Sequence, residues 1–130
     1  MKKYLFFIAV FVLGAAVIVK AQKAGPSIDQ VIKLSQDKYD IGKVKQNESA
    51  TFYIEFTNIT KKPIVVENVM AGCGCTVPET PKAPILPGKT GQVKVGYNAT
   101  SVVKFTKDVT IKIKGVQEPK IVYFTGEVVK

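Results

Sequence analysis

The fold is decided by a short stretch near the middle of the chain, Thr51–Thr57, which reads TFYIEFT. Its apolar residues Phe52, Ile54 and Phe56 alternate with more polar ones, so every second side chain falls on the same face. A period of two is typical of a β-strand with one face in a hydrophobic core and the other in solvent. The stretch therefore predicts a half-buried strand.

The same period recurs along the chain. Gly91–Tyr97 places Val93 and Val95 on one face, and Val109–Ile113 alternates in the same way. Further strands are expected at Ile121–Val129, Ile28–Leu34, Tyr39–Val44 and Pro63–Met70, and turns at Asp40–Gly42, Asn58–Pro63, Pro87–Gly88, Asn98–Ser101 and Gly115–Pro119. Beyond the start of the chain, no long stretch has a helical period. We therefore expect an all-β, immunoglobulin-like antiparallel β-sandwich of about seven strands.

The beginning of the chain has the layout of a secretory signal peptide. Lys2 and Lys3 precede the apolar run Tyr4–Val19, and we predict cleavage between Ala21 and Gln22. The run is 16 residues long, and a helix needs roughly 18 to 20 residues to cross a bilayer core. The length favours a cleaved signal helix over a retained anchor, and it predicts no transmembrane segment in the mature chain.

These boundaries divide the chain into three parts. Residues 1–21 form the predicted signal peptide, residues 22–27 a flexible mature N-terminus, and residues 28–130 the sandwich domain. Because a signal peptide directs export, we expect the protein in the periplasm, in the cell envelope or outside the cell.

The composition excludes several classes of function. The positive charges are 19 lysines without arginine, against 10 acidic residues, and removal of the signal peptide leaves 16 lysines and a net charge of +6. Nucleic-acid readers depend on arginine for bidentate contacts, so a nucleic-acid partner is not expected. The chain also has no histidine, which excludes Ser-His-Asp triads and imidazole metal ligands. We therefore predict no enzymatic activity and no cofactor.

One segment lacks the period of two that is typical of strands. Pro78, Pro81, Pro84 and Pro87 recur at every third position, which is typical of polyproline II backbone without ladder hydrogen bonds. We expect a stiff crossover between the two sheets. The alternative is a ligand for a proline-binding domain.

Cys73 and Cys75 are the two cysteines of the chain, in the sequence Gly72-Cys73-Gly74-Cys75. One hypothesis is structural, because two nearby cysteines of an exported protein can form a disulfide. Residues i and i+2 of an extended strand lie about 6.6 to 6.8 Å apart, at the upper limit for a disulfide, so a bend is required and the two glycines could supply unusual backbone angles. Two packed thiols are the other structural possibility.

Two chemical hypotheses remain open beside the structural one. A disulfide that is exposed on a loop exchanges readily with other thiols, so Cys73 and Cys75 are a candidate redox pair. Two thiolates on one face could instead hold a soft ion such as Cu(I), with Met70 as a third, weak ligand. A closed zinc site needs four ligands and is not expected.

The segment around the two cysteines resembles a family of bacterial exported proteins known only as domain of unknown function 1573. The resemblance rests on Cys73–Thr76, which reads CGCT, on the proline-bearing stretch that begins at Pro78, and on the strand that ends the segment Ala71–Ala99. In that motif Gly72, Gly74, Thr76 and Pro78 accompany the cysteine pair. One departure is Gly72, where serine is expected more often.

The flanking segments agree with this resemblance, which covers about Leu34–Val129. They are the entry at Asp40–Gly42, the strand Phe52–Asn58 and the ending Gly126–Val128. The resemblance implies a fold similar to the immunoglobulin-like sandwiches of the major sperm protein and pilus-chaperone group, whose domains mostly bind other proteins. It implies no established activity.

Two functions are consistent with the sequence. The first is a non-enzymatic interaction or structural module that binds another envelope or secreted protein on a sheet face or an edge strand. The second is a thiol–disulfide or Cu(I)-binding protein that uses Cys73 and Cys75. The sequence predicts neither the partner nor the oligomeric state.

Overall fold

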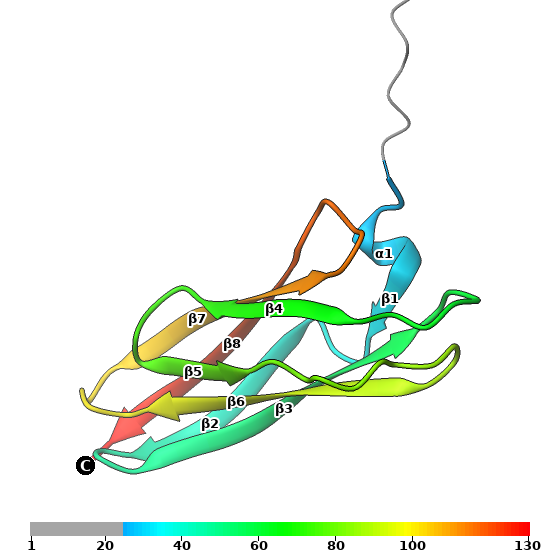
Figure 1. Ribbon diagram of the computed structural model, residues 1–130. Helices are drawn as coiled ribbons and strands as arrows, with labels where there is room; N and C mark the ends of the chain where they lie inside the picture. The colour runs from blue at the N-terminus through cyan, green and yellow to red at the C-terminus, as the bar shows by residue number, and fades with distance from the viewer. Residues whose placement is uncertain (1–24) are drawn as a thin grey trace, which may run out of the picture.

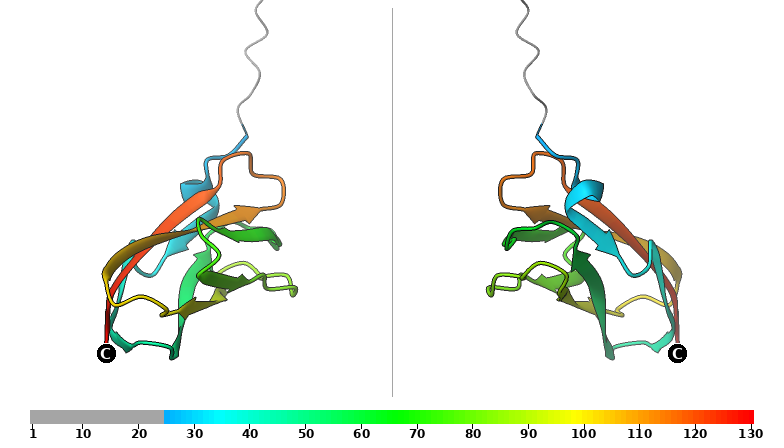
Figure 2. Two further views of the ribbon diagram at one scale, coloured as in Figure 1. Left: turned by 90° about the vertical axis from the view of Figure 1, so that its left-hand side faces the viewer. Right: turned by 90° about the vertical axis from the view of Figure 1, so that its right-hand side faces the viewer.

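The protein is described here by a computed structural model that covers residues 25–130, in which two four-stranded sheets pack face to face (Figures 1 and 2). The predicted signal peptide and the first mature residues, up to residue 24, lie outside the described part. The elements are α1 Ile28–Val31, β1 Ile32–Leu34, β2 Lys38–Lys45, β3 Ser49–Asn58, β4 Val66–Ala71, β5 Thr76–Glu79, β6 Thr90–Asn98, β7 Lys104–Ile113 and β8 Lys120–Val129. Among residues 25–130, no helix has the length and hydropathy needed to cross a membrane.

The strand order confirms the predicted sandwich. Sheet A has the order β1-β3-β6-β5 and sheet B the order β2-β8-β7-β4. All neighbouring strands are antiparallel except β2 and β8, which run parallel. This exception to the predicted antiparallel arrangement arises because the chain leaves sheet A after β1 and enters sheet B at β2, beside the last strand.

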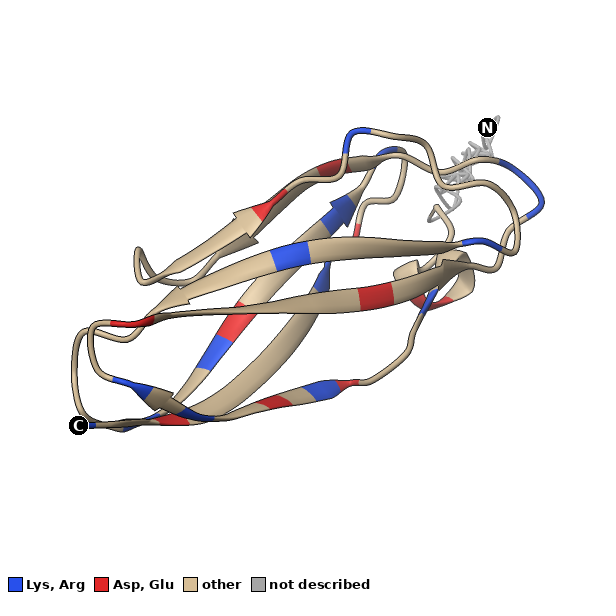
Figure 3. Ribbon diagram, turned by 90° about the horizontal axis from the view of Figure 1, so that it is seen from below, with Lys and Arg blue, Asp and Glu red and all other residues tan. Residues whose placement is uncertain are grey.

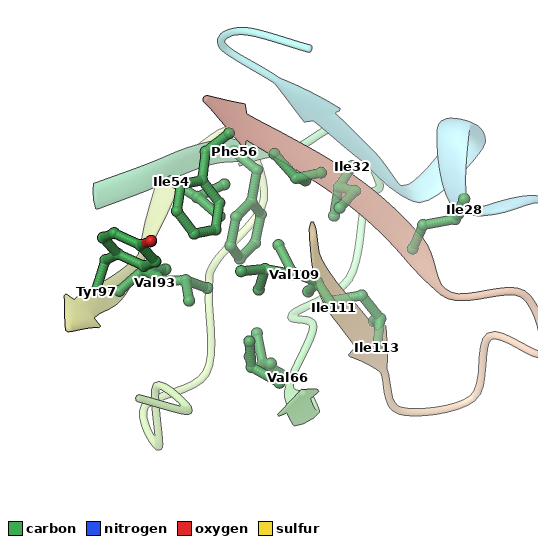
Figure 4. Close-up of a cluster of buried hydrophobic side chains, with 14 of the residues drawn as sticks. Ile28, Ile32, Ile54, Phe56, Val66, Val93, Tyr97, Val109, Ile111 and Ile113 are labelled. Atoms are coloured by element: carbon green, nitrogen blue, oxygen red, sulfur yellow. The ribbon is translucent and has the colours of Figure 1, made fainter. Parts of the chain in front are cut away.

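The core lies between the inner faces of the two sheets, as the alternating patterns predict. Ile54 and Phe56 on β3 and Val93 on β6 point towards Val109 and Ile111 on β7 (Figure 4), and all five side chains are completely buried. Burying each such side chain contributes about 1.5 to 3 kcal/mol. The core therefore holds the two sheets together through the buried parts of β3, β6 and β7.

The first predicted strand is partly wrong. Within Ile28–Leu34, residues Ile28–Val31 form the short helix α1 and only Ile32–Leu34 form a strand. The turn is closed locally, because the Ser27 N–H donates to Gln30 Oε1 at 3.2 Å and the Gln30 N–H donates to the Ser27 carbonyl at 2.9 Å. A single turn of helix is too short to show a helical period. Its consequence is a β1 strand of three residues.

The proline-bearing stretch is not the predicted crossover. Its beginning forms β5, an edge strand that pairs with β6 and places Pro78 opposite Val95, and an edge strand tolerates a proline because one side needs no donor. The chain then returns to β6 within the same sheet, with an isolated bridge between Ile64 and Ile85 on the way. The crossover from sheet B to sheet A lies earlier, at residues 72–75 between β4 and β5.

One predicted turn is also wrong. Asp40–Gly42 lies inside β2, where the pairing with β8 skips between Asp40 and Lys43. Gly42 has a φ of +73°, and its N–H donates to Asp40 Oδ1 at 2.8 Å. The turn-forming residues therefore make a β-bulge rather than end the strand.

Candidate functional site

Cys73 and Cys75 form a disulfide in the crossover between the two sheets, with their Cα atoms 5.4 Å apart. The expected bend is present. The Thr76 N–H donates to the Cys73 carbonyl at 3.3 Å, which closes a turn over residues 73–76. This turn brings the two Cα atoms well inside the range that a disulfide requires.

The two glycines of the motif do not act as expected. Gly42, Gly88 and Gly115 are the glycines of residues 25–130 with a left-handed φ, so Gly72 and Gly74 do not supply that conformation. A Cβ atom added to Gly72 would lie 2.5 Å from Asp108 Oδ1, whereas open space surrounds the corresponding position at Gly74. Gly72 therefore makes room for a carboxylate on β7. Gly74 leaves one side of the ring uncovered.

Hydrogen bonds to both sheets fix the ends of the crossover. The Gly72 N–H donates to the Asp108 carbonyl of sheet B at 3.4 Å, and the Asn98 N–H of sheet A donates to the Cys75 carbonyl at 2.8 Å. With the turn at Thr76, these bonds hold the backbone on both sides of the disulfide. The crossover is thus positioned without help from the sulfur–sulfur bond.

The ring is half-buried, and a buried hydroxyl lies beneath it. Cys73 and Cys75 are both partly exposed, while Thr76 retains only 4% of its surface. Thr76 Oγ1 lies 3.7 Å from Cys73 Sγ and 3.9 Å from Cys75 Sγ. Within residues 25–130, the two sulfurs are the hydrogen-bond partners of this hydroxyl. Sequence reasoning included Thr76 in the motif but gave it no role, because its contact with both sulfurs depends on the turn.

Cys75 also lines a cleft of about 440 Å³ at the end of the sandwich. The stacked rings of Tyr97 and Phe105, with centroids 4.1 Å apart, line it together with Lys104 and Lys107. Burial raises the pKa of the Tyr97 hydroxyl. The cleft therefore combines aromatic surface with positive charge next to Cys75.

Met70 is the third ligand in the hypothesis of a Cu(I) site. Met70 lies on β4 opposite Thr110 and is about half exposed on the outer face of sheet B. Among residues 25–130 no group of three or more His, Cys, Asp or Glu residues could hold a metal ion. A disulfide offers no thiolate, so a Cu(I) site with Cys73, Cys75 and Met70 stays a prediction for the reduced protein.

A second candidate site is the edge of β3, which sequence reasoning missed. The short β1 pairs only with Phe56–Asn58 of β3, and the Ser35 N–H extends this contact by donating to the Glu55 carbonyl at 3.0 Å. No strand of residues 25–130 pairs with residues 49–54 on that side, although β2 of the other sheet contacts β3. The edge of β3 is free because β1 is too short to pair with residues 49–54. The sequence does not reveal this length, because residues 28–31 have the pattern of a strand.

The backbone groups that face this edge can be identified. The Glu55 N–H donates to the Tyr39 hydroxyl at 3.2 Å, and its carbonyl accepts from Ser35, so both groups of Glu55 point away from β6. Because alternate residues of a strand point their backbone groups to the same side, those of Thr51 and Tyr53 also face the free edge. Burial raises the pKa of the Tyr39 hydroxyl, so this hydroxyl, which accepts the Glu55 N–H beside the edge, remains neutral.

The side chains near this edge show that the sandwich is open there. The inward-facing Ala50 and Phe52 remain partly exposed, whereas Ile54 and Phe56 farther along the same face are completely buried. Phe52 contacts the Tyr39 and Phe124 rings at 5.8 and 4.8 Å between centroids. An incoming side chain would therefore meet apolar surface beside the free backbone groups.

The other three edges carry features that block strand addition. The edge strand β2 has three lysines and the bulge at Gly42, and β5 contains Pro78. On β4 the Val69 N–H is already taken by Asn68 Oδ1 at 2.9 Å and Thr80 Oγ1 at 3.2 Å. Residues 49–54 contain neither lysine nor proline, so the edge of β3 is the least protected of the four.

Charged residues are interspersed over the surface. Lysines and acidic residues are scattered among the strands and loops in Figure 3, and pairs such as Lys94–Glu79 at 3.4 Å and Lys120–Asp29 at 2.7 Å join some of them. Exposed pairs of this kind contribute little to stability.

Comparisons with known proteins confirm the family resemblance and the fold. A family model described as "Protein of unknown function (DUF1573)" matches residues 32–128, and no curated protein matches the chain. A protein of unknown function from Porphyromonas gingivalis W83 is similar in structure, with a TM-score of 0.63 and 16% identity over 85% of this chain and 51% of the other. The chain thus spans about half the length of that protein.

Two further structures are similar to this chain in fold alone. The ASH / PapD-like domain 7 of human CEP192 has a TM-score of 0.66 at 7% identity, over 87% of this chain and 94% of the other. The YadV chaperone has a TM-score of 0.52 at 13% identity, over 76% and 52%. These similarities place the domain among the PapD-like immunoglobulin folds, and fold alone does not determine function.

Proposed function

The chain belongs to the DUF1573 family of proteins of unknown function, and from that premise we propose that its immunoglobulin-like domain is a non-enzymatic, exported module that binds an extended segment of another envelope or secreted protein. The observation that carries the proposal is the free edge of β3 at residues 49–54. The signal-like first 21 residues support export, and the lack of histidine supports a non-enzymatic role.

The proposed mode of binding is addition of a strand to sheet A. The partner would continue the line of β1 and pair with the backbone groups of Thr51 and Tyr53, since strand addition takes its affinity from main-chain hydrogen bonds. Natural proteins protect exposed edges with charges, prolines and bulges, and three edges of this domain have such protection. An edge that lacks it is consistent with a surface kept for a partner.

The side chains around this edge predict the chemistry of the partner. Successive residues of an added strand would point inward to Ala50 and Phe52 and outward to Tyr53, which is 49% exposed. Both neighbourhoods are apolar or aromatic, and cross-strand aromatic and β-branched pairs stabilise sheets. We therefore expect an extended segment rich in β-branched or aromatic residues, without proline at the paired positions.

Amide hydrogen exchange tests whether the edge is free and whether it is used. In the free domain the Thr51 and Tyr53 amides should exchange rapidly, whereas the Phe52 and Ile54 amides, which face β6, should be protected. Peptides selected on the domain from a random display library should then protect Thr51 and Tyr53. Protection of these two amides in the free domain, or selected peptides that leave them unprotected, would refute the proposal.

A matched pair of variants separates the backbone from the side chain. Thr51→Pro removes the N–H that faces the edge, and Thr51→Val retains it with a similar volume. Losing one hydrogen bond and adding a steric block should weaken peptide binding at least about tenfold for the proline variant, while the valine variant should bind like the wild type. Equal binding by both variants would show that the partner docks elsewhere.

A further inference from the structure

A feature of the cysteine site remains unexplained by a module that only binds. Thr76 Oγ1 is buried beneath the disulfide and has the two sulfurs as its partners. A neutral sulfur is a weak acceptor, and a buried hydroxyl without a good partner is costly. A thiolate, by contrast, accepts a charge-assisted hydrogen bond that is roughly twice as strong as a neutral one. The hydroxyl therefore favours the site with a thiolate over the site with a disulfide.

The position of the ring also suits exchange with another thiol. Cys75 is partly exposed, lines the cleft of about 440 Å³ and also packs against the core, so its exposed part borders the cleft. Lys104 and Lys107 line the same cleft and bring positive charge to the path of an incoming thiolate. Thr76 is closer to the Cys73 sulfur, at 3.7 Å. The two cysteines thus have different surroundings: Cys75 lines the cleft, and the Cys73 sulfur lies closer to the Thr76 hydroxyl.

The backbone would keep its shape after reduction. Three hydrogen bonds hold the crossover independently of the sulfurs: Gly72 to Asp108, Thr76 to Cys73, and Asn98 to Cys75. After the bond breaks, both thiols would remain beside the Thr76 hydroxyl. The reduced site is therefore preorganised to form the disulfide again.

From these observations we propose that Cys73 and Cys75 form a thiol–disulfide exchange site, in which Cys75 is the sulfur that is attacked and Thr76 stabilises the Cys73 thiolate that leaves. The partner supplies two thiols, either both on one protein or one on each of two small molecules such as glutathione. The proposal does not depend on strand addition at β3. It assigns to this loop a stoichiometric redox function in addition to binding.

The exchange balances as follows. One partner thiolate attacks Cys75 Sγ and forms a mixed disulfide, and the electron pair of the broken bond leaves on Cys73 Sγ, which accepts the hydrogen bond from Thr76. The second partner thiolate then attacks the partner's own sulfur in the mixed disulfide and releases Cys75 as a thiolate. The partner loses two electrons and two protons and becomes a disulfide, while Cys73 and Cys75 gain both and become thiols.

The first experiment follows the exchange itself with glutathione as the probe. The mature protein is equilibrated with mixtures of reduced and oxidised glutathione. Its disulfide should be largely reduced in the mixtures that contain most reduced glutathione, because glutathione reduces exchangeable disulfides and does not reduce structural ones. A protein that remains oxidised at every ratio would overturn the proposal.

The second experiment tests Thr76 with a matched pair of variants. Thr76→Val removes the hydroxyl at nearly constant volume, and Thr76→Ser keeps it. In the reduced protein, alkylation by iodoacetamide at pH 7 should be about tenfold slower for the valine variant. A hydrogen bond to a charged group stabilises that group by a free energy that corresponds to a factor of about ten or more, here in the fraction of thiolate. The serine variant should retain the wild-type rate and pH profile. Equal rates and pH profiles in all three proteins would refute the role of Thr76.

The third experiment tests which sulfur is attacked. Cys73→Ser leaves the Cys75 thiol, which lines the cleft, and Cys75→Ser leaves the Cys73 thiol. With oxidised glutathione at about pH 10, where both thiols are largely ionised, Cys73→Ser should form the mixed disulfide faster, as measured by mass spectrometry. Faster reaction of Cys75→Ser would contradict the assignment of Cys75. Since neither variant changes residue 76, the comparison remains informative if Thr76→Val is unstable.

Discussion

Reducing the Cys73–Cys75 bond should destabilise the domain only slightly. The bond closes a ring of three residues, and the loss of chain entropy in the unfolded state for so small a ring is worth about 1.6 kcal/mol. A bond across a loop of 100 residues would contribute about 4.7 kcal/mol. No larger loss is expected, because three backbone hydrogen bonds hold the crossover and the buried core residues include neither cysteine, although Cys75 packs against them.

Urea unfolding with and without reductant measures this difference in the same protein. With a slope of about 1.5 kcal/mol per molar urea, typical of a domain of this size, the midpoint should fall by about 1 M. The double variant Cys73→Ser/Cys75→Ser is the control and should have the lower midpoint under both conditions. A loss of more than about 3 kcal/mol on reduction, or a reduced protein that is unfolded in buffer, would show that the bond is a structural staple. The exchange proposal would then lose its physical basis.

Two further predictions concern buried polar groups. Asn58→Ala should lower the free energy of unfolding by about 3 kcal/mol in urea titrations, because four hydrogen bonds are lost, including one to the buried Ile85 carbonyl at 2.9 Å. The exposed Asn98→Ala should change it by less than about 0.5 kcal/mol, and equal effects would contradict this account. Above pH 10 the free energy of unfolding should fall as pH rises, because burial raises the pKa of Tyr39 and the unfolded chain ionises first. Tyr39→Phe should make that fall shallower in unfolding measured from pH 9 to 11, and an unchanged slope would refute it.

The strands that were predicted correctly are those with an unambiguous period. The alternation of Thr51–Thr57 and Gly91–Tyr97 lies inside β3 and β6, since residues that face the core there are almost all apolar. The first half of β7 was missed because Phe105 is its single buried apolar residue before Val109. The short β5 was missed because Pro78 argues against a strand unless the strand is known to lie at an edge. The first half of β7 and the short β5 are therefore strands because of the strands they pair with, and their local sequence patterns do not predict them.

The candidate sites were predictable to different degrees. Cys73 and Cys75 stand out in the sequence by their spacing alone. The contact of Thr76 with both sulfurs and the position of Asp108 over Gly72 depend on how β7 and the crossover meet, which local sequence does not encode. The free edge of β3 depends on a single helical turn that shortens β1. Each of these features follows from pairing between distant segments, and period and propensity describe near neighbours only.

The two proposed sites lie on one sheet but should act independently. Thr76 on β5 pairs with Tyr97 on β6, which pairs with Ala50 on β3, so two strand spacings, about 9.6 Å, separate the cysteine loop from the free edge. Tyr97 between them is held by its stacked contact with Phe105. Substitutions more than about 7 to 10 Å apart usually have additive effects, and neither substitution changes Tyr97. Thr76→Val should therefore leave peptide binding at β3 unchanged, and Thr51→Pro should leave thiol alkylation unchanged. If either substitution altered the other site, sheet A would have to couple them through β6, and the strand-addition and exchange functions would have to be treated as one.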